Sequence, residues 1–263
     1  MKDYYKKLKD SVYSISMRQQ LEFGGGQGGE LKSKYKHGKV VPAKMLARYS
    51  SSALAVNMLG VADSLGLGAD YWDSVFGLRN YFHGRNVECH FEKHLKVSGV
   101  RGFTPNLDFY IEGGERFLGV ESKYREMYAR KRKQVVQEQY LEKFPYWGEW
   151  KDLRRTAEKV DSYAKLGRLD AAQLIKHSLA LISAAEKVGT AGKFRLLYLY
   201  HDVLDDESVR KEHLSEIRRF AEESGLGRHF IPLPYSRYVK RMETFRKYFD
   251  ADYLPFIHKR YAL

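Results

Sequence analysis

The stretch TPNLDFYIEGGERFLGVESKYRE, residues 104–126, decides the fold that this sequence predicts. It holds two β-like runs, LDFYIE and RFLGVES, on either side of Gly113 and Gly114. Two glycines between two such runs are a strong signal for a tight antiparallel hairpin. With those glycines as the loop, Glu112 would lie opposite Glu115, and each step back along one strand would match a step forward along the other.

One face of this hairpin gathers charged side chains near its open end. In the expected register Asp108 lies opposite Gly119, and because side chains alternate with period two, Glu121 and Lys123 share that face. Asp108 and Glu121 would then be diagonal neighbours, able to reach one cation. Gly119 would leave room opposite Asp108 for the ion or for a close backbone approach.

The residue types suit metal-assisted hydrolysis of a phosphodiester. Two carboxylates a few ångström apart repel unless a cation lies between them. Mg²⁺ prefers oxygen ligands and is commonly held by one or two carboxylates together with substrate phosphate. Lys123 beside the ion could orient or deprotonate the attacking water and offset charge on the phosphate. The Glu-x-Lys motif alone has little specificity, because it also begins at Glu30 and Glu149, outside any expected strand. The competing interpretation of the hairpin residues is an ordinary solvated sheet face.

The composition is that of a folded, basic protein. Of the 263 residues, 43% are hydrophobic and 30% are charged, close to globular averages. The 46 Lys and Arg exceed the 33 Asp and Glu, and the net charge of +13 favours a polyanionic partner, nucleic acid before an anionic membrane surface. Cys89 is the only cysteine, and no apolar run approaches the roughly eighteen residues of a membrane span. We therefore expect a cytoplasmic protein without disulfides or a membrane partner.

The chain divides into a basic lead-in, residues 1–47, and one domain, residues 48–263. The glycines of residues 24–30 predict a turn or tether, because a phosphate loop would end in Gly-Lys-Ser/Thr and follow a strand. Residues 87–97 stay open between strand and helix. Periodicity, caps and breakers predict helices over residues 49–66, 128–165 with a break at Pro145, 169–189 and 206–223, and strands over residues 193–203 and 230–233. This order predicts an α/β fold with a mixed central sheet flanked by helices.

The sequence resembles the PD-(D/E)XK nuclease superfamily, in its bacterial restriction-enzyme-like branch. The residues that carry the resemblance are Pro105-Asn-Leu-Asp108, Glu121-Ser-Lys123 and, on the helix that follows, Ala172-Gln173-Leu-Ile-Lys176-His177. Pro105 is not adjacent to Asp108, which departs from the strict pattern. The resemblance spans residues 48–235 and implies a restriction-endonuclease-like fold and hydrolysis of DNA that leaves a 5′-phosphate.

The resemblance also implies the roles of the hairpin residues. Asp108 and Glu121, with the backbone carbonyl of Ser122, would hold Mg²⁺, with Mn²⁺ as an alternative. Lys123 would be the catalytic lysine.

Residues outside the hairpin would complete the site. The family often supplies a further acidic ligand from an earlier helix, for which Glu92 is the first choice and Glu88 the second. Gln173 and Lys176 would face the site from the following helix and contact phosphate.

Other signals are weaker. Cys89, His90, Glu92 and His94 gather potential zinc ligands, but a structural zinc normally needs four protein ligands and no second cysteine exists. No nucleophile motif supports a catalytic triad, which favours structural roles for three further histidines: His177, His201 and His229. Four consecutive basic residues are typical of a solvated helix face, although tracking of the phosphate backbone is an equal alternative; these are Arg130, Lys131, Arg132 and Lys133.

We therefore predict a metal-dependent endonuclease of restriction or repair type that cuts DNA. The alternative is a noncatalytic nucleic-acid-binding module on the same fold. Paired carboxylates argue against that alternative, since they would repel phosphate unless a metal intervened. A homodimer would suit the cutting of both strands. The recognition sequence is not predicted, because base readout depends on loops placed in a groove.

Overall fold

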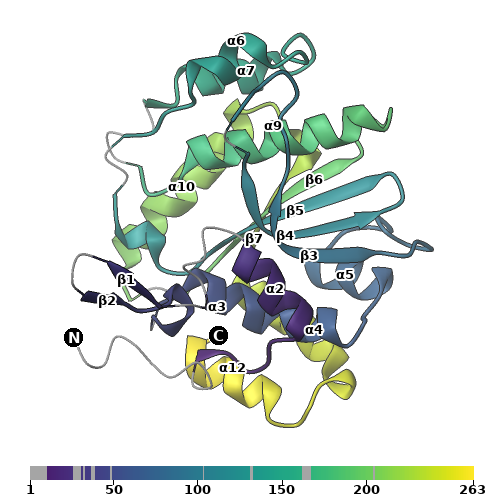
Figure 1. Ribbon diagram of the computed structural model, residues 1–263, viewed down its shortest axis with the longest axis vertical. Coiled ribbons are helices and arrows are strands. Elements are labelled where there is room, and N and C mark those ends of the chain that lie inside the picture. Colours follow the sequence, from purple (N-terminus) through teal and green to yellow (C-terminus); the bar gives the residue numbers. More distant parts are fainter. Residues whose placement is uncertain are drawn as a thin grey trace.

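The central feature of the fold is a five-stranded mixed sheet with the strand order β3-β4-β5-β6-β7. The computed structural model describes residues 11–25, 31, 33–36, 39–47, 49–102, 104–130, 133–161, 167–203 and 205–263. β3, β4 and β5 are antiparallel neighbours, whereas β6 and β7 run parallel to β5. The strands span β3 (Glu88–His94), β4 (Asn106–Gly113), β5 (Arg116–Lys123), β6 (Phe194–Tyr200) and β7 (Phe230–Pro234). Figure 1 shows the sheet with helices on both sides, the mixed α/β arrangement that the sequence predicts and that is consistent with a restriction-endonuclease-like fold.

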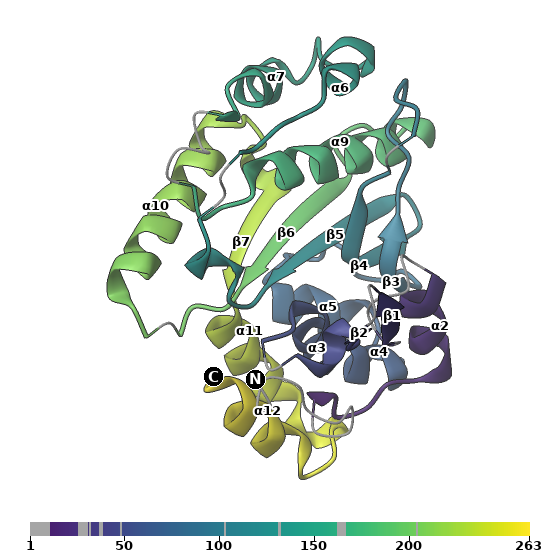
Figure 2. The same cartoon turned by 60° about the vertical axis from the view of Figure 1, so that its left-hand side comes forward.

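The helices form two layers. One layer packs below the sheet in Figures 1 and 2 and consists of α3 (Ser51–Ala55), the π-helical segment η2 (Val56–Gly60), α4 (Val61–Ser64), α5 (Ala69–Phe76), α11 (Tyr235–Met242) and α12 (Tyr253–Tyr261). The other layer lies above the sheet and consists of α6 (Glu138–Lys143), α7 (Lys151–Glu158), α9 (Ala171–Lys187) and α10 (Glu207–Glu223). Shorter elements are α2 (Met17–Gly25), β1 (Lys34–Lys36), β2 (Lys39–Val41), η1 (Lys44–Leu46), η3 (Glu126–Tyr128), η4 (Gly227–His229) and η5 (Glu243–Tyr248).

Alternation along the strands gives each layer its own hydrophobic core. Leu118 and Val120 of β5 join the core between the sheet and the lower helix layer. Leu196 and Tyr198 of β6 join the core between the sheet and α9. A strand covered on both faces reads as a continuous apolar run. This is why β6 is buried along its whole length except at Arg195.

The hairpin between β4 and β5 is present, but its register differs from the prediction. Gly113 pairs with Arg116, so the two-residue loop is Gly114-Glu115 rather than Gly113-Gly114. Gly114 has a φ of +60°, which suits the first position of a type II′ turn and favours glycine there. The left-handed conformation is therefore needed one residue later than the glycine pair suggested.

This register moves Gly119 away from the position that the sequence predicted. Gly119 pairs with Tyr110, not with Asp108. A Cβ on Gly119 would lie 2.8 Å from Leu107 and 3.0 Å from Leu181 of α9. The expectation that Gly119 leaves room for an ion is wrong, because the missing side chain lets α9 pack closely on the sheet.

The remaining predictions of elements mostly hold. Ser50 caps the helix that begins at α3 by accepting from the Ala53 amide at 3.1 Å. The helices and strands expected over residues 169–189, 206–223, 193–203 and 230–233 correspond to α9, α10, β6 and β7. The ambiguous residues 87–97 form β3, interrupted by a φ of +50° at Glu92. The expected helix over 128–165 is wrong for residues 133–137, which form no regular element, while α6 ends before Pro145 as predicted.

The first residues of the chain join the domain in part. α2 lies against β3, with Phe23 and Phe91 ring centroids 5.1 Å apart. Most of the glycine-rich residues 24–30, namely 26–30, lie outside the described residues. In the part of the chain that the structure describes, no helix has the length and apolarity needed to cross a membrane.

Candidate active site

The candidate site lies where β4 and β5 diverge. The pairing of the two strands ends at Phe109 and Val120. Beyond that pair, the Asp108 carboxylate replaces a backbone acceptor, and its Oδ2 accepts from the Ser122 amide at 2.7 Å. Because the N–H and C=O of a strand residue point to the same neighbouring strand, the Ser122 carbonyl is directed to the Asp108 side.

Glu121 is the most deeply buried acidic group of the site. Its side chain is 1% exposed and forms an ion pair with Lys123. Apart from this ion pair, neither carboxylate oxygen has a hydrogen-bond partner among the described residues. Burial raises the pKa of Glu121 to about 7, against the opposing effect of Lys123. A buried carboxylate without hydrogen bonds is costly unless a cation stabilises it.

The charged form of Asp108 is destabilised in the same way as that of Glu121. Burial raises its pKa well above the ordinary value, and the neighbouring charge of Glu121 raises it further. Lys123 and the Ser122 amide act in the opposite direction. The two carboxylates thus interact electrostatically.

Lys123 is held in a fixed place between the sheet and α9. Its side chain is 14% exposed, and its Nζ donates to Gln173 Oε1 at 3.1 Å. Burial lowers the pKa of Lys123, but the nearby carboxylates of Glu121 and Asp108 outweigh burial and raise it. The ammonium group therefore stays charged in a largely enclosed position.

The N-terminal part of α9 lies against the site. Asp170 caps the helix, since its Oδ1 accepts from the Gln173 amide at 3.0 Å. Gln173 and His177 are one turn apart and share a face. The Nδ1 of His177 lies 3.3 Å from Oε2 of Glu121. Gln173 therefore contacts Lys123, and His177 contacts Glu121.

His177 is the residue that sequence reasoning did not assign to the site. We expected a structural histidine, yet its ring is 2% exposed and faces the Glu121 carboxylate. Its spacing of four residues from Gln173 on an amphipathic helix was the available signal, because i and i+4 side chains point in the same direction.

Lys176 lies at the border of the site. It lines a cavity of about 300 Å³ together with Asn106, Gln137, Asp170, Gln173 and His177, among others. The cavity is open and largely polar in its lining residues, and it adjoins the Lys123–Gln173 contact.

The residues that could hold Mg²⁺ are Asp108, Glu121 and the Ser122 carbonyl. All are oxygen donors, as Mg²⁺ requires, and the buried Glu121 carboxylate already lies against the charged Lys123, so it fits a cation. The charge of Lys123 offsets part of the same repulsion, so the protein tolerates the pair without an ion.

The further acidic ligand is not brought to the same point. Glu92 lies on β3, not on a helix, and its carboxylate accepts from the Asn106 side chain. Within the described ranges, Glu92, Asp108 and Glu121 do not come together as a group with ligand atoms within 4.8 Å. Glu88, the second choice, pairs with Glu112 at the other end of β3. Its position is therefore wrong for a ligand that joins Asp108 and Glu121.

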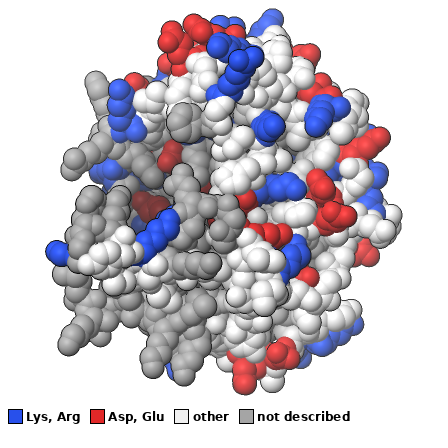
Figure 3. Space-filling model, viewed as in Figure 1, with Lys and Arg blue, Asp and Glu red and all other residues white. Residues whose placement is uncertain are grey.

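Of the four consecutive basic residues, Arg130 and Lys133 do not lie on a helix. Arg130 forms an ion pair with Glu212 at 3.2 Å, and Lys133 is exposed in an irregular segment. Lys131 and Arg132 lie outside the described residues. Figure 3 shows Lys and Arg interspersed with Asp and Glu over the described surface of one face, so the net charge of +13 is not gathered into one field there.

The potential zinc ligands of residues 89–94 lie on a strand, which separates neighbouring side chains. Cys89 is buried in the core beneath the sheet, whereas His90 is partly exposed on the opposite face. Successive residues of a strand point to opposite faces. Cys89 and His90 therefore point away from each other.

Comparison with known families decides the relationship. Residues 17–233 match the model of a family described as Restriction Endonuclease associating with ARP. The chain belongs to this family. The match runs from α2 into β7, so it contains the hairpin, α9 and every candidate site residue.

The other comparisons add nothing to this relationship. No curated protein matches the chain, and no solved structure matches it. The family supports a restriction-endonuclease-like assignment, in agreement with the mixed sheet and its flanking helices.

Proposed function

We propose that this protein is a metal-dependent endonuclease that hydrolyses DNA phosphodiester bonds, with Mg²⁺ as the cofactor and Mn²⁺ as an alternative. The observation that carries the proposal is the buried carboxylate of Glu121, which is ion-paired with Lys123 and lies beside Asp108. The family match supports a nuclease-like role. The residues also follow the PD-(D/E)XK pattern, and we assign the site to that superfamily on this basis.

Asp108, Glu121 and the Ser122 carbonyl would hold the ion. When bound, a divalent cation polarises a phosphoryl oxygen and makes a bound water more acidic. The contribution of the protein is to keep the buried Glu121 carboxylate and the partly buried Asp108 carboxylate oriented. The Ser122 amide fixes Asp108, and β5 fixes Glu121.

Lys123 would orient the attacking water and offset negative charge that develops on the phosphate. Its ammonium group is already positioned by Glu121 and Gln173, so little reorganisation is needed when substrate arrives. Gln173 acts through Lys123 and is therefore a positioning residue.

DNA would approach from the open cavity beside α9. Lys176 lines this cavity and is suited to contact a phosphate as a point charge. Arg130, Lys131, Arg132 and Lys133 would add contacts to the DNA backbone, which supply nonspecific affinity. Glu92 would join the metal only after releasing Asn106. Two copies of the chain would allow both strands to be cut.

The test is cleavage of supercoiled and linear duplex DNA with Mg²⁺ or Mn²⁺ and with EDTA. Glu121→Ala is compared with Glu115→Ala, which removes an exposed carboxylate from the same hairpin. We expect metal-dependent cutting by the wild type and by Glu115→Ala, and none by Glu121→Ala.

Two results would count against the enzyme. Cutting that survives in Glu121→Ala would remove Glu121 from the mechanism, and cutting that survives in EDTA would remove the metal ion. DNA binding without cutting, across substrates that differ in sequence, modification and strandedness, would favour the noncatalytic binding module. Binding is measured in parallel by gel shift, so the two readouts are independent.

A further inference from the structure

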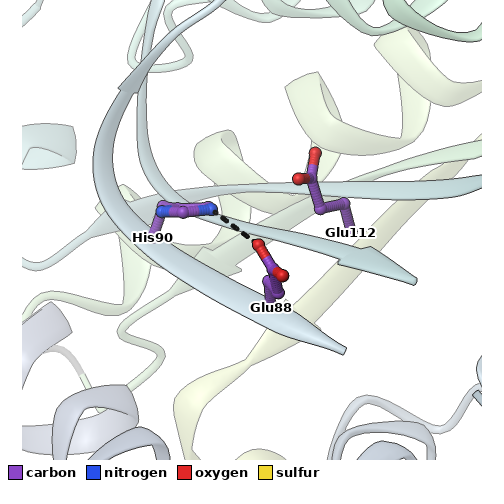
Figure 4. Close-up of side chains that lie close together, drawn as sticks. All are labelled: Glu88, His90 and Glu112. Carbon is purple, nitrogen blue, oxygen red and sulfur yellow. Dashed lines mark ion pairs between the residues drawn. The ribbon is translucent and has the colours of Figure 1, made fainter. Parts of the chain in front are cut away.

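A second group of potential metal ligands lies at the other end of β3 and β4. Glu88, His90 and Glu112 each offer one ligand atom, and these atoms all lie within 4.8 Å of one another. Figure 4 shows the three side chains on two adjacent strands, with a dashed line from Glu88 to His90. Within the part of the chain that the structure describes, they form the only such group of three or more.

The His90 ring is oriented so that one nitrogen is left for a ligand. Glu22 of α2 lies 3.4 Å from Nδ1 of His90, and its other oxygen accepts from the Phe91 amide at 3.0 Å. Nε2 of His90 is buried and has no hydrogen-bond partner among the described residues. A carboxylate that holds one imidazole nitrogen while the other binds a cation is the usual outer arrangement of histidine metal sites.

The two glutamates would be destabilising neighbours without a cation. Glu88 and Glu112 are direct cross-strand partners, and like charges in that position repel. Oε2 of Glu88 lies 4.0 Å from Nε2 of His90. That separation is too long for a hydrogen bond. The Glu88 side chain is 75% exposed, so it is free to change rotamer and close the remaining gap around an ion.

The ligand chemistry differs from that of the candidate active site. One imidazole with two carboxylates suits a borderline divalent ion such as Zn²⁺, which binds three protein ligands and water. Mg²⁺ is not selected by a set that includes histidine.

We propose that Glu88, His90 and Glu112 form a second divalent transition-metal site, separate from the nuclease centre and selective for Zn²⁺ over Mg²⁺. The site joins β3, an edge strand of the sheet, to β4. A bound ion would therefore hold the edge strand in place and stabilise the native state, and Glu22 would orient the histidine from α2.

The experiment is calorimetric titration of the metal-free protein with Zn²⁺ in excess Mg²⁺, with Co²⁺ absorption spectra as a second readout. The variants are His90→Gln and Glu112→Gln, with Glu115→Gln as a matched control on the same hairpin. Glu121→Gln separates this site from the nuclease centre. Melting temperatures of the metal-free variants report folding.

We expect the wild type, Glu115→Gln and Glu121→Gln to bind one Zn²⁺ and to gain thermal stability. His90→Gln and Glu112→Gln should lose at least about tenfold in affinity and lose the Co²⁺ spectrum. If His90→Gln has a lowered melting temperature in the metal-free state, the proposal is tested with Glu112→Gln and with Glu22→Gln, which removes the carboxylate that orients His90. Glu22→Gln should bind Zn²⁺ about ten- to a hundredfold more weakly than the wild type.

Three outcomes would overturn the proposal. The wild type could fail to bind Zn²⁺ in the presence of Mg²⁺, which would leave a surface ion pair only. His90→Gln and Glu112→Gln could bind as the wild type does. Glu121→Gln alone could abolish binding, which would place the ion in the nuclease centre.

Discussion

His177 of α9 and Glu121 of β5 face each other in the interior with Nδ1 and Oε2 3.3 Å apart. Neither atom has a hydrogen-bond partner among the described residues. Burial lowers the pKa of His177 to about 3, helped by the charge of Lys123. The imidazole is therefore neutral at physiological pH, and the contact is not an ion pair despite its short distance. A neutral imidazole therefore lies against the Glu121 carboxylate.

Replacing His177 should weaken the response to metal. In His177→Leu, we expect a ten- to hundredfold higher Mg²⁺ requirement for cleavage, because partners that orient a ligating carboxylate typically contribute that much. The measurement is cleavage rate against Mg²⁺ concentration. Saturating Mg²⁺ should restore much of the rate, and an unchanged Mg²⁺ requirement would show that His177 only fills space.

Lys123 should be needed for the chemical step rather than for binding. Lys123→Met removes the charge but keeps a similar unbranched chain, and we expect single-turnover cleavage to fall by about 10²–10⁴-fold. The control is Lys193→Met, which removes an exposed lysine paired with Glu115 at the far end of the sheet. Equal losses in both variants would point to nonspecific charge effects.

His213 should make stability depend on pH. It is 1% exposed, and its Nε2 lies 2.9 Å from the Tyr198 hydroxyl. Burial, then Arg168, lowers the pKa of His213 from 6.5 to about 4. As pH falls through 6.5, the unfolded state takes up the proton first. Stability is therefore lost from pH 6.5 downward until the folded state is protonated near pH 4, by about 3 kcal/mol in total.

The matched variant for this effect is His213→Gln, which keeps a hydrogen-bonding group but does not titrate. We expect its disadvantage in unfolding free energy to shrink by more than about 1 kcal/mol between pH 7 and pH 5.5. Urea unfolding at both pH values gives the difference, in which other titrating groups cancel. A difference that stays constant with pH would contradict the lowered pKa.

Gly119→Ala should destabilise the protein through overpacking. The new Cβ would meet Leu107 at 2.8 Å and Leu181 at 3.0 Å, and both side chains are fully buried. We expect a loss of about 1–3 kcal/mol. Gly148→Ala is the control, because a Cβ there meets nothing within 4 Å. Thermal unfolding of both variants tests this, and a loss below about 0.5 kcal/mol for Gly119→Ala would mean that α9 shifts freely.

The local pattern was enough to predict the elements that carry the site. Alternating apolar residues around a glycine pair gave the hairpin of β4 and β5, and an apolar stripe at helical spacing gave α9. The side-chain types at Asp108, Glu121 and Lys123 indicated the chemistry. The error in the register did not change the face of the sheet on which each side chain lies, so these three residues were still expected on the correct face.

Other features depended on contacts that the local pattern does not contain. The loop position followed from φ at Gly114, and the purpose of Gly119 followed from side chains on β4 and α9. Residues 133–137, which form no regular element, were mistaken for part of a helix because charged residues favour helices weakly and tertiary packing overrides that preference.

The sequence by itself determined the mixed α/β fold class, the hairpin, and the acidic and basic residues at its open end, because strand alternation and helix capping are local. Only the tertiary structure decided that His177 contacts Glu121, that Gln173 holds Lys123, and that Glu88, His90 and Glu112 converge. These relationships join residues that are distant along the chain. Their geometry is set by how α9 and α2 pack on the sheet, which depends on long-range burial rather than on periodicity.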